Sequence, residues 1–356
     1  MEYSFSTREK NGGICLILSY KVNSKWKQKT RQGFKTLREA KQYQDKLLAA
    51  AKEDAACGAD PELADITFKS FTQNIYLRDK GSSLEYSTKR NYFFMLRSIP
   101  ALCDKPIREI TAGDVINVYQ DMARFSSGTR KNRFAQIRAI FNYALNPYKI
   151  ITANPADSVT QAKDKTIRRI KALTEKESRQ LLSALSDTPT FYMIAFIALN
   201  TGMRYGEIAG LTWNSVNFTR QTITIDKQYN WISPEKRGFK AVKSRNGNRT
   251  IHMNTKLAAR LNAWKQTVPI SIDGRVIPTT PSTHALMNRQ LRKLKQGISV
   301  HTLRHTFATM LLSKSKDINL VAAVLGDNVA TVAATYIHYT DDIRKEADQY
   351  IETMYK

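Results

Sequence analysis

Three polar residues at helical spacing, in the segment HTLRH, mark the first place where this sequence could do chemistry. His301 and His305 flank Arg304. Residues three and four positions apart share one face of a helix, so all three side chains can reach one ligand. A guanidinium grips two oxygens of an anion at once, and an imidazole adds a further donor or moves a proton. The spacing therefore predicts a site for an anion such as a phosphate.

Two other interpretations of this segment have to be weighed. The spacing of His301 and His305 would also let two imidazoles share a metal ion. The zinc-protease pattern, however, needs a glutamate after the first histidine, and Thr302 stands there. Arg304 would also put a permanent cation beside the ion, so we expect no metal and no cofactor. An ordinary surface helix with scattered polar residues stays open from this segment alone.

Three further stretches place polar residues where they could join such a site. In LNTGMRYGEIAGL, Arg204 stands at the junction of two helical segments, with Glu207 three residues on. VKSRNGNRTI puts Lys243 beside a tight turn, from which a flexible ammonium can reach a ligand. VLGDNVATVAATYIHY puts Tyr336 on a short helix near the C-terminus. Each stretch alone would pass as ordinary structure.

The order of the four stretches resembles the tyrosine recombinases, in particular the integrases of phages and conjugative elements. The family signature has an arginine in TGxRxxE, a lysine on a β-hairpin, HxxRH, LGH, and a tyrosine nine residues beyond that last histidine. This sequence has TGMRYGE, Lys243, HTLRH and LGD, with Tyr336 nine residues after Asp327. Any one motif is weak, whereas four in this order are a strong indication.

The resemblance implies a site-specific DNA recombinase that cuts and rejoins DNA through a 3′-phosphotyrosyl intermediate. Tyr336 would attack the phosphodiester and release a 5′-hydroxyl. Arg204 and Arg304 would stabilise the extra charge of the phosphorane. His301 would donate to a non-bridging oxygen, and Lys243 would protonate the leaving oxygen. The catalytic residues expected from the resemblance are Tyr336, Arg204, Lys243, His301, Arg304 and His305.

His305 would act on the nucleophile, and two further side chains would have supporting roles. His305 would orient or deprotonate the tyrosine, and Glu207 would brace the cations. Asp327 departs from the family, which usually has histidine or tryptophan there. Because a phosphate would repel an ionised carboxylate, we expect Asp327 to orient a cation such as His305 or an arginine instead. Tyr339 is the nearest rival nucleophile, and the family spacing selects Tyr336 over it.

Four regions would carry these residues. Residues 13–35 alternate as strands do, and Thr36 with Glu39 forms a capping-box pattern before a helix. Residues 67–148 carry apolar stripes at helical spacing. The fold class expected is multidomain and mainly α with small β-sheets. The regions are a β-β-α arm-binding domain (1–62), a helical core-binding domain (63–160), a linker (161–172) and a mixed α+β catalytic domain with a C-terminal tail helix (173–356).

The last region contains the expected sheets. QTITIDKQYNW reads as a strand. A second strand pair is expected around FKAVKSR and NRTIHM, joined by an NG turn at Asn246 and Gly247. The family resemblance would place Lys243 on that hairpin.

The charge and the cysteine content of the chain limit the partners and the compartment that we expect. The 356 residues include 56 Lys and Arg against 31 Asp and Glu, a net charge of +25. Such an excess suits a polyanion, and we expect double-stranded DNA attachment sites as the partner. No run approaches the length of a membrane span, the first residues lack a signal peptide, and the three cysteines form no CxxC pair. These features predict a cytoplasmic protein with no membrane partner.

One basic segment could face DNA directly. GTRKNRFAQIRAIFNYAL mixes cations with an apolar stripe, and a solvated face is an equally open alternative. The candidate DNA-binding residues are Arg130, Lys131, Arg133 and Arg138.

The tail and the wider assembly follow from the resemblance. Residues 341–356 carry an apolar stripe, and such a helix in the family docks on a neighbouring protomer of a homotetramer on DNA. Folding back on its own domain is the alternative. The enzyme would integrate and excise a mobile element, with an excisionase and a DNA-bending protein as possible accessories. Competing interpretations are a chromosome-dimer resolvase, a type IB topoisomerase-like enzyme, and a non-catalytic DNA-binding regulator.

Overall fold

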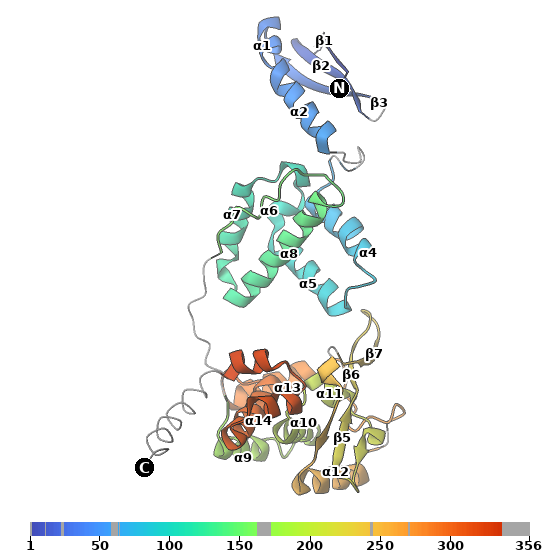
Figure 1. The fold of residues 1–356 in the computed structure, drawn as a ribbon, viewed down its shortest axis with the longest axis vertical. Helices are drawn as coiled ribbons and strands as arrows, with labels where there is room; N and C mark the ends of the chain where they lie inside the picture. The colour runs from blue at the N-terminus through green and yellow to red at the C-terminus, as the bar shows by residue number, and fades with distance from the viewer. Residues whose placement is uncertain are drawn as a thin grey trace, which may run out of the picture. The chain divides into compact units, whose positions relative to one another are not determined.

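The chain forms two compact units, residues 1–165 and 166–356 (Figure 1). The computed structural model describes residues 2–10, 12–22, 25–57, 63, 65–161, 172–242, 245–269 and 271–336. Lys243, most of the expected linker and the tail after residue 336 therefore lie outside the described residues.

The first unit begins with a three-stranded antiparallel sheet. Its elements are β1 (Tyr3–Lys10), β2 (Gly13–Val22), β3 (Lys25–Phe34), α1 (Leu37–Gln42) and α2 (Gln44–Cys57). Leu16 and Leu18 point to one face of β2, as the period of two requires, and are fully buried with Ala40 and Ala51 of the helices. Strand β1 was not expected. The alternation of apolar and polar residues in YSFSTREK is a weak signal for a strand. In the structure, Tyr3 at its start is 48% exposed.

The rest of the first unit is helical. Its main elements are α3 (Phe68–Ser70), a π-helical turn (Phe71–Tyr76), α4 (Leu77–Asp79), α5 (Tyr86–Ser98), α6 (Pro100–Cys103), α7 (Ala112–Asp121) and α8 (Ser127–Leu145). Four phenylalanines, Phe68, Phe71, Phe134 and Phe141, are almost fully buried in its core. The helices thus fold because their apolar stripes meet, as the spacing predicted.

The second unit packs helices beside small sheets (Figure 1). Its helices are α9 (Glu175–Ala184), α10 (Pro189–Thr201), α11 (Tyr205–Gly210), α12 (Thr255–Thr267), α13 (Thr283–Leu294), α14 (Val300–Ser315), α15 (Ile318–Leu325) and a helix over Val329–Tyr336. Its strands are β4 (Val216–Asn217), β5 (Thr222–Ile225), β6 (Lys227–Trp231), β7 (Arg237–Ala241) and β8 (Arg249–His252). Mainly α with small sheets is the expected fold class, which is confirmed.

One expected strand pairing is wrong. β7 pairs with β6, and β8 pairs with β5 in the order β4-β5-β8, so no hairpin joins β7 to β8. A two-residue NG hairpin needs positive φ at its central residues. Neither Asn246 nor Gly247 has it, because residues 245–247 form a 3₁₀ turn. Burial decides the pairing instead, since Ile251 of β8 lies opposite Ile223 of β5 in the core.

Among the described residues, no single helix is long and apolar enough to cross a membrane. Ile318–Leu325 and Val329–Tyr336 meet that test only together, as a pair bent by 113°.

Candidate active site

Arg304 is the most deeply buried cation of the site. It lies on α14, whose start is fixed by a capping box between Ser299 and Thr302, and its side chain is only 3% exposed. Its Nη1 donates to the carbonyl of Gly202 (2.7 Å), and its Nη2 donates to the carbonyl of Leu325 (3.0 Å). A buried guanidinium needs such partners, and here the ends of two helices supply them.

Arg204 comes from the turn between α10 and α11. Gly202 ends α10 with φ +66°, and a Cβ there would meet Leu325 and Phe307 at 2.6 Å, so the close approach requires glycine. Arg204 is the N-cap residue of α11, and its backbone N–H donates to the Glu207 carboxylate (3.0 Å). Its Nη1 donates to the same carboxylate (2.8 Å). Glu207 therefore holds both the backbone N–H and the guanidinium of Arg204.

Glu207 joins Arg204 to Arg249, a residue for which the motifs predicted no role. Arg249 Nη2 donates to Glu207 (3.0 Å), and both side chains are nearly buried, at 6% and 4% exposed. Burial alone would raise the pKa of Glu207, but the hydrogen bonds and charges of Arg249 and Arg204 outweigh it and lower that pKa. Arg249 Nε also donates to the carbonyl of Val324 (2.7 Å), which ties β8 to the end of α15.

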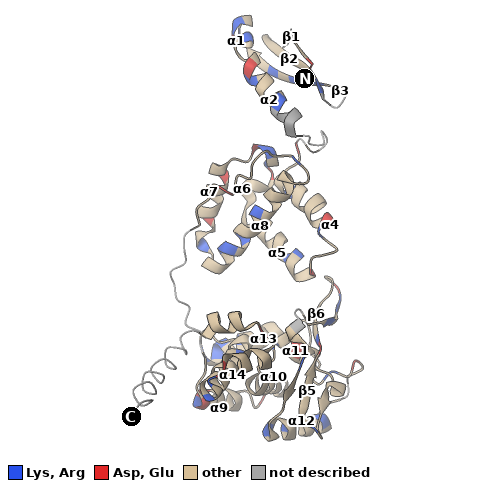
Figure 2. Ribbon diagram, viewed as in Figure 1, with Lys and Arg blue, Asp and Glu red and all other residues tan. Residues whose placement is uncertain are grey.

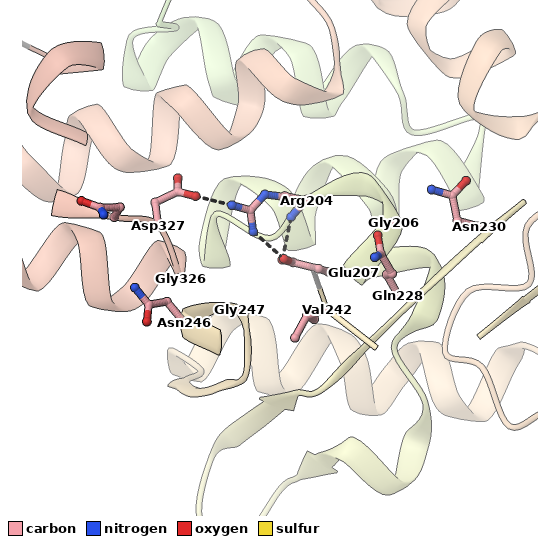
Figure 3. A pocket seen from close by; sticks show the side chains of 11 residues that line it. Arg204, Gly206, Glu207, Gln228, Asn230, Val242, Asn246, Gly247, Gly326 and Asp327 are labelled. Atoms are coloured by element: carbon pink, nitrogen blue, oxygen red, sulfur yellow. Dashed lines mark hydrogen bonds and ion pairs between the residues drawn. The ribbon is translucent and has the colours of Figure 1, made fainter. Parts of the chain in front are cut away.

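Asp327 bridges the two arginines of the motifs. One carboxylate oxygen accepts from Arg204 Nη2 and the other from Arg304 Nη2, the latter at 2.6 Å. Figure 3 shows the Asp327 carboxylate directed at Arg204, with Glu207 on the other side of the guanidinium. We call Arg204, Arg304 and Asp327 the arginine clamp. Of the two kinds of cation expected to pair with Asp327, the arginines do so.

His305 contacts the tyrosine. Its Nδ1 lies 2.8 Å from the Tyr336 hydroxyl, and the two rings meet edge to face. Burial, followed by the proximity of His301 and Arg304, lowers the pKa of His305 to about 4. The Tyr336 side chain itself is only 3% exposed and packs in an apolar cluster with Leu312, Val321 and Val332 among others.

His301 lies one helical turn before His305. The ring centroids of the two histidines are 4.5 Å apart. Although His301 is exposed at the surface, contact with its neighbours removes part of its hydration, and with the charge of Arg304 this lowers its pKa. Arg204, Arg304 and the two histidines thus lie in one cluster with Tyr336, and three separate stretches of the chain supply them.

A cavity of about 740 Å³ opens beside the clamp. It is lined by Arg204, by Asp327 and Asn328 after α15, and by polar side chains from β6 and the turn before β8, namely Gln228, Asn230 and Asn246, which Figure 3 labels. Val242 and Asn246 also line the cavity, and Lys243 lies between these two residues in sequence. The site is therefore open to a ligand on the side of Arg204.

The candidate DNA-binding residues lie on α8 in the first unit, where Figure 2 colours Lys and Arg blue. Arg138 forms an ion pair with Asp157 (2.8 Å), in which both side chains are 52% exposed. Arg130 lies over the Tyr119 ring and Arg133 over the Phe125 ring, whereas Lys131 is exposed. Of the four candidate cations, Arg138 is therefore ion-paired, Arg130 and Arg133 stack on aromatic rings, and Lys131 is exposed.

Comparison with known proteins decides the family. The profile described as the phage integrase family matches residues 171–342, and one described as an arm DNA-binding domain matches residues 7–51. The chain belongs to the tyrosine recombinases. This recombinase is 23% identical to the ICEBs1 integrase of Bacillus subtilis (strain 168) over 349 residues, which are 89% of this chain and 90% of that protein. The motif-based resemblance and the site-specific recombinase activity that it implies are confirmed.

Other relatives agree. A tyrosine recombinase of Pseudothermotoga lettingae is 26% identical over 232 residues, 63% of this chain and 75% of that one. The Tn1549 transposon integrase, solved in complex with a circular intermediate DNA, has a TM-score of 0.67 at 21% identity and covers 80% of this recombinase and 99% of that chain. A lambda integrase dimer bound to a core site has a TM-score of 0.59 at 18% identity, covering 92% and 93%. These likenesses show the fold of the recombinase.

Proposed function

We propose that the recombinase opens DNA by attack of Tyr336 on a phosphodiester held by Arg204 and Arg304. One observation carries this proposal. The fold puts the phenol on His305 (2.8 Å) and brings two guanidinium groups onto the single carboxylate of Asp327. A positioned hydroxyl nucleophile and a two-cation site for an anion are what phosphoryl transfer to tyrosine requires.

Arg304 keeps donors for a phosphate. A guanidinium has five N–H groups, and the carbonyls of Gly202 and Leu325 and the Asp327 carboxylate take three. Within the described part of the chain, Nε–H and one Nη1–H have no hydrogen-bond partner. Because the guanidinium is already fixed, it would stabilise a doubly charged phosphorane more than a singly charged phosphodiester.

We assign His305 to orienting the phenol. With a pKa of about 4, its ring is neutral near pH 7 and can accept a hydrogen bond from the Tyr336 hydroxyl. Moving a proton from an ordinary phenol, with a pKa near 10, to such an imidazole would cost roughly 8 kcal/mol. A phosphate nearby would reduce this cost, because an anion favours the charged imidazole.

His301 and Lys243 complete the proposed chemistry. His301, exposed beside His305, would donate to a non-bridging phosphate oxygen. Lys243, the proposed general acid for the leaving 5′-oxygen, lies outside the described residues. Its assignment is supported by Val242 and Asn246, which lie on either side of it in sequence and line the cavity next to Arg204. Glu207 would brace the cations through its bonds to Arg204 and Arg249.

The proposal extends to the assembly on DNA. The arm DNA-binding match to residues 7–51 supports an arm-site domain over 1–62, with core-site binding by residues 63–160 and catalysis by residues 173–356. Lambda integrase has been seen as a tetramer bound to a Holliday junction, which supports a homotetramer here. Residues 341–356, outside the described part of the chain, would link its protomers. The enzyme would integrate and excise a mobile element such as a phage or conjugative element in the cytoplasm, with an excisionase and a DNA-bending protein as accessories.

A covalent-trapping experiment tests the nucleophile. Full-length protein is mixed, in excess EDTA, with nicked suicide substrates made from the ends of the mobile element that carries the gene. We expect an SDS-resistant protein–DNA adduct with the wild type and with Tyr339→Phe, and none with Tyr336→Phe. An adduct that survives in Tyr336→Phe would refute the assignment. Tight DNA binding with no wild-type adduct would favour a non-catalytic regulator.

A further inference from the structure

We propose that Asp327 is an internal substitute for the scissile phosphate. Its carboxylate bridges Arg204 and Arg304 before DNA binds. The phosphodiester has to displace this carboxylate before Tyr336 can attack. This inference rests on the proposed function, because it assumes that Arg204 and Arg304 receive the phosphate.

The geometry of the bridge is that of an anion held between two cations. Each oxygen of the Asp327 carboxylate accepts from a different arginine, one from Arg204 Nη2 and one from Arg304 Nη2. A phosphodiester likewise offers two anionic oxygens to the forked donors of guanidinium groups. Within the described residues, no other carboxylate contacts both arginines. The Asp327 carboxylate therefore occupies the position in which a bridging phosphate would be bound most strongly.

The charges favour an exchange of anions over a simple addition. Three guanidinium groups, of Arg204, Arg249 and Arg304, face two carboxylates, of Glu207 and Asp327, which leaves the cluster with one net positive charge. A phosphodiester added beside both carboxylates would feel little net attraction and direct repulsion from Asp327. If the phosphate replaces Asp327 instead, each arginine of the clamp keeps an anionic partner.

The two carboxylates differ in how firmly they are held. Glu207 is 4% exposed and accepts from the backbone and side chain of Arg204 and from Arg249. Asp327 is 23% exposed and its carboxylate accepts only from the two arginines of the clamp, among the described residues. Glu207 is therefore a fixed brace, whereas Asp327 can be exchanged.

The exchange needs only side-chain rotation. Gly326, with φ +66°, ends α15, and the Asp327 backbone N–H donates to the carbonyl of Ala322 (3.1 Å). A Cβ on Gly326 would meet the carbonyl of Asn246 at 2.6 Å, so the two main chains are closely packed here. The side chain does have room, because Asp327 lines the 740 Å³ cavity, together with the amides of Asn246 and Asn328.

A displaceable ligand and a permanent brace predict opposite results when the charge of Asp327 is removed. We would measure single-turnover adduct formation on the suicide substrate at subsaturating DNA, with full-length wild type and Asp327→Asn. We expect the adduct rate to rise about tenfold, because the phosphate no longer competes with a carboxylate. A permanent brace would give a slower rate instead, and that result would overturn the proposal.

Asp317→Asn is the matched control. Asp317 caps the other end of α15 through the N–H groups of Asn319 and Leu320, and asparagine caps a helix about as well as aspartate. This variant changes the net charge by the same amount without touching the clamp. We expect its adduct rate to stay within about twofold of wild type. An equal rise in both variants would attribute the effect to net charge and sink the proposal.

Inorganic phosphate provides a second readout that needs no DNA. We expect Asp327→Asn to melt at a lower temperature than wild type without phosphate, since two guanidinium groups lose their shared anion. Added phosphate should then raise the Tm of this variant more than that of wild type or Asp317→Asn, because the clamp can bind it. Equal shifts in all three would contradict the proposal. If wild type forms no adduct, the proposed function fails, and this phosphate measurement still decides the role of Asp327.

Discussion

The two halves of the active site are held by different interactions. The clamp half consists of ionic hydrogen bonds, in which Asp327 joins Arg204 to Arg304 and the ends of two helices supply carbonyls. In the nucleophile half, apolar packing buries the Tyr336 ring, and its hydroxyl meets His305 (2.8 Å). One half is therefore organised by charge, and the other mainly by burial.

The two halves therefore have to change in different ways when DNA binds. A phosphate can approach the clamp from the cavity, because Arg204 is 38% exposed there. It cannot reach the Tyr336 hydroxyl in the same way, because that side chain is 3% exposed. The clamp needs an exchange of partners, whereas the tyrosine needs its packing to open. Substitutions in the clamp should therefore change stability and chemistry together, and those beside the tyrosine should separate the two.

Arg304→Lys should have the largest effect. Lysine keeps the charge, but a compact ammonium cannot reproduce the fork that meets Gly202, Leu325 and Asp327. We expect the adduct rate to fall about 10³-fold and the free energy of unfolding to fall by about 3 kcal/mol. Single-turnover trapping and urea unfolding measure the two quantities.

Arg260→Lys is the control for Arg304→Lys. Arg260 is exposed on α12, where it donates to the Tyr192 hydroxyl (3.1 Å), so both quantities should stay close to wild type. An adduct rate for Arg304→Lys within tenfold of wild type would mean that positive charge is enough and that the hydrogen bonds of the guanidinium fork are not needed. That result would contradict a clamp held together by ionic hydrogen bonds.

The sequence predicted the clamp better than its surroundings. Arg204, Arg304 and Tyr336 stand in local motifs whose order marks the family, so no three-dimensional information was needed to find them. Arg249 was missed because its partners, Glu207 and the carbonyl of Val324, lie far away in sequence. One signal could have found it. Arg249 and the buried Ile251 share a face of β8, so the arginine has to face inward and needs a buried anion.

The sheets were predicted less well for a related reason. Local turn residues, Asn246 and Gly247, suggested a hairpin, whereas burial of Ile251 against Ile223 selected a more distant partner strand. Strand pairing is decided by which faces can be buried together, and this is a property of the whole core. The helices, whose periodicity is local, were found where the spacing predicted them.

His305→Gln should have an intermediate effect. Glutamine cannot reproduce the geometry of the His305 contact with the Tyr336 hydroxyl, so we expect the adduct rate to fall about 10²-fold. Stability should respond to pH as well. The folded pKa of His305, about 4, lies below the ordinary value of 6.5, so the unfolded chain binds more protons between these values. The free energy of unfolding should therefore fall as the pH falls from about 6.5 to 4, with up to about 3 kcal/mol from this residue.

Urea unfolding at pH 4.5 and pH 7 measures this contribution. The wild type should lose more stability on acidification than His305→Gln, although the lowered pKa of His301 contributes in the same direction to both. His252→Gln, at the exposed end of β8, is the control and should keep the wild-type response. The same pH response in wild type and His305→Gln would rule out a partly buried, neutral imidazole beside the tyrosine.

Substitutions of cations outside both halves should have the smallest effects. Arg138 already pairs with Asp157 at the surface, whereas the exposed Lys131 has no ion pair among the described residues. Such positions contribute below about 1 kcal/mol to stability. If α8 faces DNA, Lys131→Gln should reduce the slope of log K against log salt by about 1, and Arg138→Gln should reduce it less. Filter binding at several salt concentrations measures both slopes. No change in either slope would make α8 a solvated face, and DNA recognition in the helical region would have to come from other residues.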